Sequence, residues 1–174
     1  MMHLVTGGSG SGKSAYAEEQ ILKSPEKKRI YIATMLPFGE EGRQRVERHR
    51  RMRKDKGFET VECYTGLSDL RLQEDCAVLL ECVSNLTANE MYQEEGAGED
   101  TFQAVTQGIR SLNRQAGTLV VVTNEVFSDG ICYDPSTMKY METLGKINQY
   151  LAGEADQVTE VVYGIPLSLK KGDV

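Results

Sequence analysis

Residues 7–14 read Gly7-Gly8-Ser9-Gly10-Ser11-Gly12-Lys13-Ser14 and match the pattern G-x-x-x-x-G-K-[S/T] at every fixed position. Glycines let the backbone curl until several N–H groups point at one anion, and a following helix adds the positive end of its dipole. Lys13 is placed to reach the β- and γ-phosphates of a nucleoside triphosphate, and the Ser14 hydroxyl to coordinate Mg²⁺. The stretch therefore predicts a phosphate-binding loop (P-loop); the alternative is an ordinary glycine turn between strand and helix.

The segments around this motif alternate between strand and helix character. Apolar or β-favouring stretches predict strands at residues 2–6, 29–33, 58–63, 77–82, 118–123, 158–162 and 167–170. Composition and three- to four-residue apolar spacing predict helices at residues 13–22, 41–56, 102–112 and 140–151. We interpret residues 93–100 as a loop and residues 164–166 as a turn. This order predicts an α/β, P-loop NTPase-type three-layer fold with a mostly parallel central sheet, in which residues 1–174 form one nucleotide-binding catalytic domain.

The net charge of −6 arises from 20 Lys and Arg against 26 Asp and Glu, and it is unevenly distributed. Residues 43–56 hold eight basic and two acidic side chains, a local charge of +6, which leaves −12 on the remaining 160 residues. Hydrophobic residues make up 40% of the chain and charged residues 26%, which is typical of globular proteins and excludes a mainly disordered or coiled-coil chain. An acidic body also argues against a general nucleic-acid binder.

Cellular location is predicted from the absence of targeting features and from the cysteines. The apolar runs are too short for a membrane span, and Gly7 begins a glycine-rich loop where a leader would stay apolar. Cys63, Cys76, Cys82 and Cys132 form no C-x-x-C pair, which disfavours a zinc site and predicts reduced thiols, with Cys82 in a core strand. We therefore expect a cytoplasmic protein.

The basic segment surrounds one histidine, His49, and three interpretations fit it. Charge runs of this kind usually form a solvated helix face, and a nucleic-acid patch is a second reading. The third is an anion-binding wall that faces the P-loop. In that setting, neighbouring cations disfavour the imidazolium and keep the ring neutral, so that His49 can attack a phosphorus and carry it covalently.

Carboxylates follow two of the buried strands that the sequence predicts. Glu81 ends Val78-Leu79-Leu80, where P-loop proteins often place a carboxylate for the metal, although a plain strand-end carboxylate is the alternative. Thr123-Asn124-Glu125 ends the next buried strand at a similar position, so that a substrate contact and an ordinary turn both remain open.

A further set of motifs makes the pattern specific. They are Leu4-Val5-Thr6-Gly7-Gly8 with Ser11-Gly12-Lys13-Ser14, Tyr31-Ile32-Ala33-Thr34, the Arg-rich stretch with His49, Val61-Glu62-Cys63, Leu79-Leu80-Glu81-Cys82, Val122-Thr123-Asn124-Glu125-Val126, Ile147-Asn148-Gln149-Tyr150-Leu151-Ala152 and Ala155-Asp156-Gln157-Val158. In this order and combination, from residue 2 to about residue 165, the sequence resembles the family of bifunctional adenosylcobinamide kinases / adenosylcobinamide-phosphate guanylyltransferases. The resemblance departs at Gly10 and Arg48, where members often carry Arg and a second His, and in the loop after Val126.

The resemblance implies two reactions of cobalamin biosynthesis. A nucleoside triphosphate, ATP or GTP, phosphorylates the aminopropanol hydroxyl of adenosylcobinamide; GTP then guanylylates a histidine, and GMP passes to adenosylcobinamide phosphate to give adenosylcobinamide-GDP. It implies His49 and Lys13 as catalytic residues, Ser14 and Glu81 as Mg²⁺ ligands, and a homotrimer. The nucleotide contacts it implies are Gly7, Gly8, Ser9, Gly10, Ser11, Gly12, Lys13, Ser14, Thr34, Met35, Leu36, Arg50, Arg51, Met52, Arg53, Glu62 and Glu81.

Two other functions compete with this interpretation, and base selection adds a hypothesis to it. A small P-loop kinase acting on a nucleoside or other metabolite would use residues 43–56 as an anion clamp. A nucleotide-gated RNA or DNA binder is disfavoured, because no aromatic residue lies between Arg43 and Lys56 to stack on bases. For base selection, Glu62 is a candidate acceptor for the N–H groups of guanine, because the Lys-x-Asp motif of GTPases is missing after the strand at residues 118–123.

Overall fold

A computed structural model describes residues 1–37, 39–72 and 75–172; within helix α2 the side chains of residues 41, 45, 48, 49 and 52 lie outside the described part. The strands are β1 (Met2–Thr6), β2 (Lys28–Ala33), β3 (Phe58–Glu62), β4 (Cys76–Glu81), β5 (Thr118–Val122), β6 (Gln157–Val162) and β7 (Ile165–Lys170). The helices are α1 (Lys13–Lys23), α2 (Gly39–Lys54), α3 (Val83–Tyr92), α4 (Thr101–Gln115) and α5 (Pro135–Glu154), with 3₁₀ turns η1 (Leu67–Asp69) and η2 (Gly98–Asp100).

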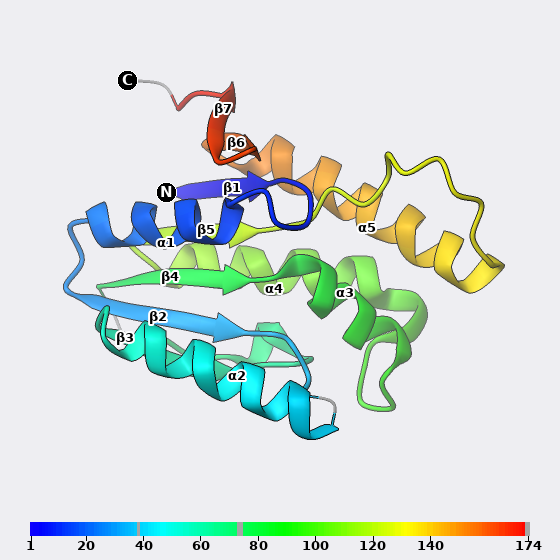
Figure 1. Cartoon of the computed structure of the whole chain (residues 1–174), viewed down its shortest axis with the longest axis horizontal. Coiled ribbons are helices and arrows are strands. Elements are labelled where there is room, and N and C mark those ends of the chain that lie inside the picture. The colour runs from blue at the N-terminus through cyan, green and yellow to red at the C-terminus, as the bar shows by residue number, and fades with distance from the viewer. Residues whose placement is uncertain (38, 73–74, 173–174) are drawn as a thin grey trace.

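The strands form one sheet in the order β3-β2-β4-β5-β1-β6-β7. Neighbouring strands pair in parallel except β6 and β7, which form an antiparallel hairpin at one edge. The arrowheads of β1, β2, β4 and β5 therefore end at the same side of the molecule, next to the P-loop and α3 (Figure 1). The mostly parallel three-layer α/β fold predicted from the sequence is confirmed.

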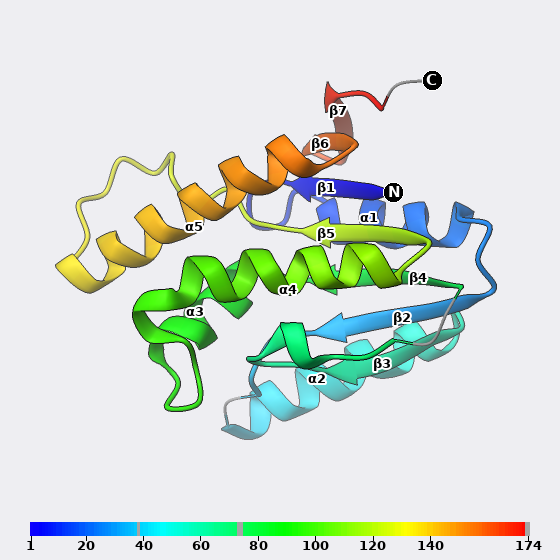
Figure 2. The ribbon, with the colours of Figure 1, turned by 180° about the vertical axis from the view of Figure 1, so that it is seen from behind.

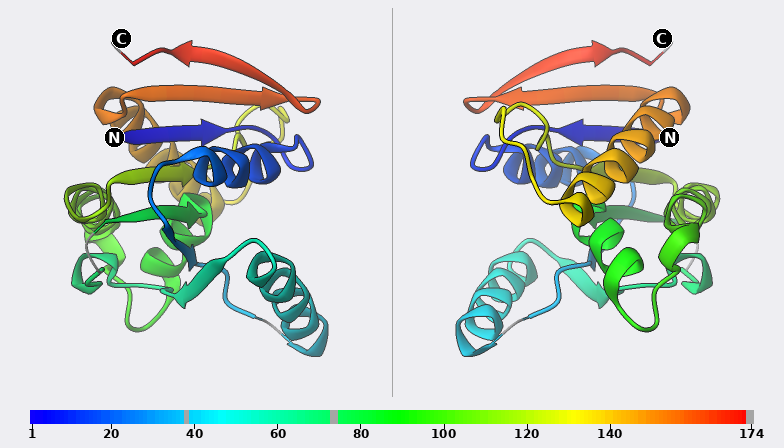
Figure 3. Two further views of the ribbon diagram at one scale, coloured as in Figure 1. Left: turned by 90° about the vertical axis from the view of Figure 1, so that its left-hand side faces the viewer. Right: turned by 90° about the vertical axis from the view of Figure 1, so that its right-hand side faces the viewer.

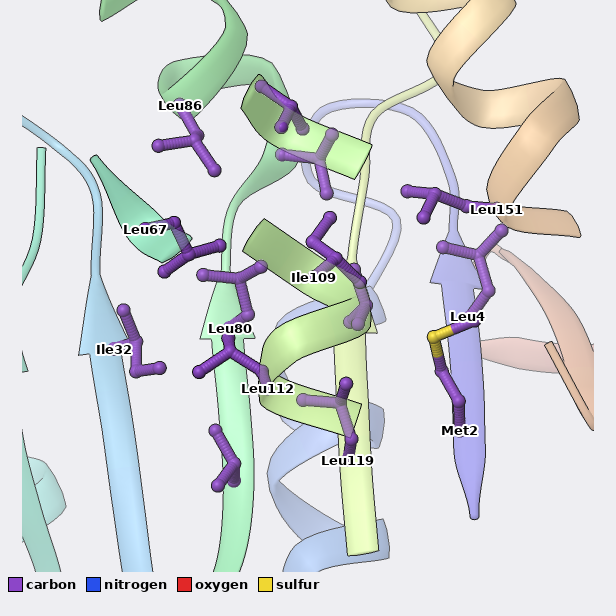
Figure 4. Close-up of a cluster of buried hydrophobic side chains, with 14 of the residues drawn as sticks. Met2, Leu4, Ile32, Leu67, Leu80, Leu86, Ile109, Leu112, Leu119 and Leu151 are labelled. Carbon is purple, nitrogen blue, oxygen red and sulfur yellow. The ribbon is translucent and has the colours of Figure 1, made fainter. Parts of the chain in front are cut away.

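Helices cover both faces of the sheet, and this explains why the central strands are apolar throughout. Helices α1 and α2 lie on one side, and α4 and α5 on the other (Figures 2 and 3). Alternate residues of a strand face opposite sides, so Leu79 of β4 packs toward α1 while Val78 and Leu80 pack toward α4. Figure 4 shows the larger cluster, where Leu80 and Leu119 meet Ile109 and Leu112 of α4.

The sequence-based element boundaries agree with the structure to within a few residues, with three exceptions. Helix α3 was not predicted: its sequence VSNLTANEMY starts with β-branched and polar residues of modest helix propensity, and packing stabilises it. Cys82 lies just beyond β4, where it caps α3, and not in the strand. The turn at residues 164–166 was also misplaced, because Tyr163 and Gly164 form the two-residue hairpin turn with positive φ angles and Pro166 pairs in β7.

Two further sequence-based expectations concern thiols and membrane spans. Each of the four cysteines, all of them in the described ranges, is a free thiol. None of the described helices combines the length and the apolar character needed to cross a bilayer.

Candidate active site

The P-loop connects the end of β1 to the start of α1 and is held from two sides. Gly10 and Gly12 have φ angles of +71° and +94°, a region that favours glycine. A Cβ atom on Gly12 would lie 3.3 Å from the Cα of Gly164 in the β6–β7 turn. The Gly164 N–H donates to the Ser11 carbonyl at 2.8 Å. The hairpin turn therefore packs directly against the loop, and glycine at position 12 is required by both conformation and space.

Lys13 folds back over the loop. Its Nζ atom donates to the Gly8 carbonyl oxygen at 3.0 Å, and the residue is buried. This contact holds the ammonium group over the ring of backbone N–H groups, where the phosphates of a nucleotide bind in P-loop proteins.

Glu81 joins the P-loop to the end of β4. Its Oε1 atom accepts a hydrogen bond from the Ser14 hydroxyl, and its Oε2 atom accepts one from the Tyr31 hydroxyl at 3.1 Å. A hydroxyl and a carboxylate are hard oxygen donors of the kind Mg²⁺ prefers, and Mg²⁺ usually takes few protein ligands and completes its shell with phosphate and water. This pair therefore has the donor chemistry that fits Mg²⁺ bound together with phosphate.

Tyr31, on β2, lies beneath the last turn of α2. The Arg53 guanidinium carbon stands 3.7 Å from the centre of the Tyr31 ring, and Phe58 meets that ring edge-on at 6.2 Å. Burial, followed by the neighbouring Glu81 carboxylate, raises the pKa of Tyr31, so its hydroxyl stays protonated and donates. Arg53 is 6% exposed, and its Nε atom has no hydrogen-bond partner among the described residues.

These groups line one cavity of about 320 Å³ at the carboxyl ends of the strands. Of the residues implied by the resemblance, the cavity brings together Lys13, Ser14, Met35, Arg53, Glu62 and Glu81. Among the side chains of α2 that the structure describes, Val46 and Arg53 line the cavity. The basic helix predicted from the sequence therefore faces the P-loop across this cavity with at least one of its arginines.

Glu62, at the end of β3, forms the far side of the cavity. Its Oε1 atom accepts a hydrogen bond from the Arg50 Nη2 atom at 2.8 Å. Burial and a hydrogen bond to Glu62 raise the pKa of Tyr64, whose hydroxyl donates to that carboxylate. Glu62 therefore lines the cavity with its carboxylate held by defined partners.

Other residues implied by the resemblance take different positions. Thr34 is fully buried, exchanging hydrogen bonds with the Cys82 backbone at 2.7 and 2.9 Å, so it supports the loop from which Met35 reaches the cavity. Leu36 is half-buried. Arg51 pairs with Glu47 at 3.2 Å, with its side chain 79% exposed. The side chains of Arg48, His49 and Met52 lie outside the described residues, although all three positions belong to α2.

Sequence reasoning missed several of the lining residues. Tyr31, Ala33, Val46, Tyr64, Cys82, Asn85 and Val122 also line the cavity, and so does Asn124, for which the sequence left a substrate contact and an ordinary turn open. The first two lie within the motif at residues 31–34, which gave a usable signal. Asn85 was not recognisable because α3 was not predicted. Asn124 donates to the Ser84 hydroxyl, which explains how the polar end of β5 is fixed beside α3.

Comparison with known proteins supplies the family. The family model for cobinamide kinase / cobinamide phosphate guanyltransferase matches residues 3–169. The chain belongs to this family. The bifunctional adenosylcobalamin biosynthesis protein CobU of Escherichia coli (strain K12) is 34% identical over 98% of this chain and 100% of its own length. The CobU protein of Salmonella typhimurium is 32% identical with the same coverage.

Structural comparison confirms the fold independently of sequence. The flagellar accessory protein FlaH from Methanocaldococcus jannaschii superposes with a TM-score of 0.53 at 10% identity, covering 98% of this chain and 78% of its own. At that identity the likeness concerns the fold alone. Family membership makes the chain a bifunctional transferase, cobinamide kinase and cobinamide phosphate guanylyltransferase, of adenosylcobalamin biosynthesis.

Proposed function

We propose that both reactions take place at the cavity between the P-loop and α2, with the triphosphate held by residues 7–14 and His49 as the guanylylated residue. One observation carries the proposal: Lys13 and Ser14 of the P-loop and Val46 and Arg53 of α2 line the same cavity. Residues three and four apart share one face of a helix. Position 49 is three residues after Val46 and four before Arg53 in α2, a spacing that supports His49 as the guanylylated residue.

In the kinase reaction, the aminopropanol hydroxyl of cobinamide attacks the γ-phosphorus. A new O–P bond forms as the bond from the γ-phosphorus to the β–γ bridging oxygen breaks, and a nucleoside diphosphate leaves. Lys13 and the N–H groups of the P-loop stabilise charge on the phosphates. Ser14 and Glu81 would hold Mg²⁺, which would neutralise part of that charge.

In the guanylyltransferase reaction, a ring nitrogen of neutral His49 attacks the α-phosphorus of GTP, and pyrophosphate leaves. A phosphate oxygen of cobinamide phosphate then attacks the same phosphorus, the P–N bond breaks, and the imidazole is restored. Arg53 is buried in the cavity wall, and its Nε has no hydrogen-bond partner within the described part of the chain, so it is available to stabilise charge on the transferred group. Its neighbours Arg50, Arg51 and Met52 are proposed as nucleotide contacts with it, as are Met35 and Leu36, whereas the fully buried Thr34 is proposed to act through the loop that it supports.

Glu62 is the proposed guanine or ribose contact. It lies at the end of β3, lines the cavity, and is oriented by Arg50 and Tyr64. A carboxylate can accept hydrogen bonds from the N1–H and N2–H₂ groups of guanine. Adenine has no N–H group at positions 1 and 2, so a carboxylate at this place suits selection of GTP.

We also propose an assembly and a cellular setting for the enzyme. The proposal is a cytoplasmic protein with one catalytic domain over residues 1–174 and, by family resemblance, a homotrimeric assembly. Light scattering of the purified protein tests the trimer directly, and a monomer at working concentrations overturns it.

The two activities are tested together by supplying cobinamide and GTP labelled at either phosphate. Label on the γ-phosphate is expected to appear in cobinamide phosphate, and label on the α-phosphate is expected first on the protein and then in cobinamide-GDP. Transfer from the α-phosphate with no labelled protein at any time would contradict the covalent pathway.

A further inference from the structure

Tyr31 contacts both halves of the site. It is 7% exposed and lies on β2, between the P-loop side of the cavity and α2. Its hydroxyl donates to the Oε2 atom of Glu81 at 3.1 Å, while its ring supports the Arg53 guanidinium at 3.7 Å. One side chain thus connects the carboxylate assigned to the kinase centre with the helix that contains His49.

The hydroxyl end acts on Glu81. The other carboxylate oxygen of Glu81 accepts the Ser14 hydroxyl, so both oxygens are held, each from a different element. Mg²⁺ requires near-ideal octahedral geometry, and a carboxylate fixed at both oxygens presents a defined direction for a metal. Loss of the Tyr31 hydroxyl leaves one oxygen of Glu81 without its donor and frees the group to rotate.

The ring end acts on α2. Arg53 belongs to the last turn of the helix, and its guanidinium stacks on the Tyr31 ring. Phe58 of β3 meets the Tyr31 ring at 87°, which fixes the plane on which the guanidinium rests. Removing the ring therefore releases the last turn of α2 from the sheet.

We propose that Tyr31 is a positioning residue for both reactions: its hydroxyl orients Glu81 for phosphoryl transfer, and its ring anchors α2, through Arg53, for guanylyl transfer. The inference rests on the proposed roles of Glu81 and His49. The hydroxyl and the ring of Tyr31 thus have separate effects, and two substitutions test these effects separately.

The test compares Tyr31→Phe, Tyr31→Leu and a matched control, Tyr150→Phe. Tyr150 packs against Phe102 of α4 in the core on the opposite face of the sheet, so the control loses a phenol hydroxyl away from the cavity. Kinase rate across a Mg²⁺ titration, α-phosphate labelling of the protein, and calorimetric binding of a non-hydrolysable GTP analogue with and without Mg²⁺ are measured for each. Thermal melting verifies that each variant is folded.

Tyr31→Phe is expected to lower the kinase rate about tenfold, raise the Mg²⁺ concentration needed for half the maximal rate, and weaken the Mg²⁺-dependent part of analogue binding. Its guanylylation rate should fall much less. Tyr31→Leu is expected to lower the kinase rate as far as Tyr31→Phe does. It should lower the guanylylation rate about tenfold further than Tyr31→Phe, because only the phenylalanine variant keeps the aromatic ring.

Three results overturn the inference. The first is an equal loss of both reactions in Tyr31→Phe and Tyr31→Leu, and the second is a larger loss of guanylylation than of kinase activity in Tyr31→Phe. The third is that the rates of both variants equal those of Tyr150→Phe. If Tyr31→Leu does not fold, Phe58→Leu removes the edge-on contact that fixes the plane of the Tyr31 ring instead. It must then lower guanylylation more than the kinase rate, and the reverse order also overturns the inference. Absence of labelled protein in the wild type would instead refute the proposed function.

Discussion

The Ser14 hydroxyl, in the first turn of α1, donates a hydrogen bond to the Oε1 atom of Glu81 at the end of β4. Strands β4 and β1 are separated by β5 in the sheet, so this contact spans two strand positions. It places a hydroxyl and a carboxylate next to Lys13, whose ammonium group lies over the P-loop. The arrangement supports the proposed single centre for γ-phosphoryl transfer.

Replacement of Glu81 tests that centre. Glu81→Gln keeps the size of the side chain but removes its charge, and we expect the kinase rate to fall by about 100-fold, the upper end for changes around a metal site. The loss should be partly reversed by raising Mg²⁺, since a weaker ligand lowers affinity for the ion. Steady-state rates over a Mg²⁺ series measure this. A kinase rate within twofold of wild type would remove Glu81 from the centre.

Gly12 is predicted to tolerate no side chain. Its φ of +94° disfavours any L residue, and a Cβ there would press on the Cα of Gly164 at 3.3 Å. We expect Gly12→Ala to lower the free energy of unfolding by about 2 kcal/mol, read from urea denaturation, and to weaken nucleotide binding.

The matched control is Gly153→Ala in α5, where no atom lies within 4 Å of the added Cβ and φ is not positive. That substitution should leave stability unchanged or raise it by about 0.5–1 kcal/mol, because alanine favours helices. Equal effects of the two substitutions would show that the strain assigned to Gly12 is absent.

Glu62 is predicted to select the base. Glu62→Gln replaces one of its two acceptor oxygens with an NH₂ donor, so discrimination between GTP and ATP should decrease by about tenfold, which corresponds to the loss of one hydrogen bond. Competition binding of GTP against ATP measures the ratio. An unchanged ratio with unchanged GTP affinity would remove Glu62 from nucleotide recognition.

His3 provides a pH-dependent test that is independent of catalysis. It is buried in β1, where its Nε2 atom lies 2.8 Å from the Thr159 hydroxyl, and burial lowers the pKa of His3. The unfolded chain therefore binds a proton before the folded one does. The contribution of His3 to stability is complete above its unfolded pKa of about 6.5 and is lost as pH falls below that value toward the folded pKa.

Denaturant unfolding between pH 5 and pH 8 measures this dependence. The wild type should lose stability on acidification through this range. In His3→Gln the slope of the free energy of unfolding against pH should be smaller, by an amount that corresponds to at most one bound proton. Parallel profiles for the two proteins would contradict the assignment.

Much of the fold could be predicted because local and global signals agree. The apolar stretch of β4 and the 3.6-residue spacing of Val105, Ile109 and Leu112 each reflect burial that occurs in the structure. Helix α3 could not be predicted, because Ser84, Thr87 and Asn89 are buried there and hydrogen-bonded, in an environment created only by the folded chain.

The site also contains residues whose roles could be predicted from the sequence and one whose role could not. Lys13, Ser14 and Glu81 were identifiable because each is fixed by a short motif or a strand end. Tyr31 lies in the motif at residues 31–34, but its role could not be predicted from that motif, since the role comes from two contacts to residues 22 and 50 positions away in the sequence, Arg53 and Glu81.

The central claim is that one histidine carries the guanylyl group. Protein incubated with GTP labelled at the α-phosphate should acquire acid-labile, alkali-stable label, and peptide mapping should place it at His49. His49→Asn should abolish the label. His3→Gln should retain it, because His3 is buried on β1. Label that persists in His49→Asn would contradict the account.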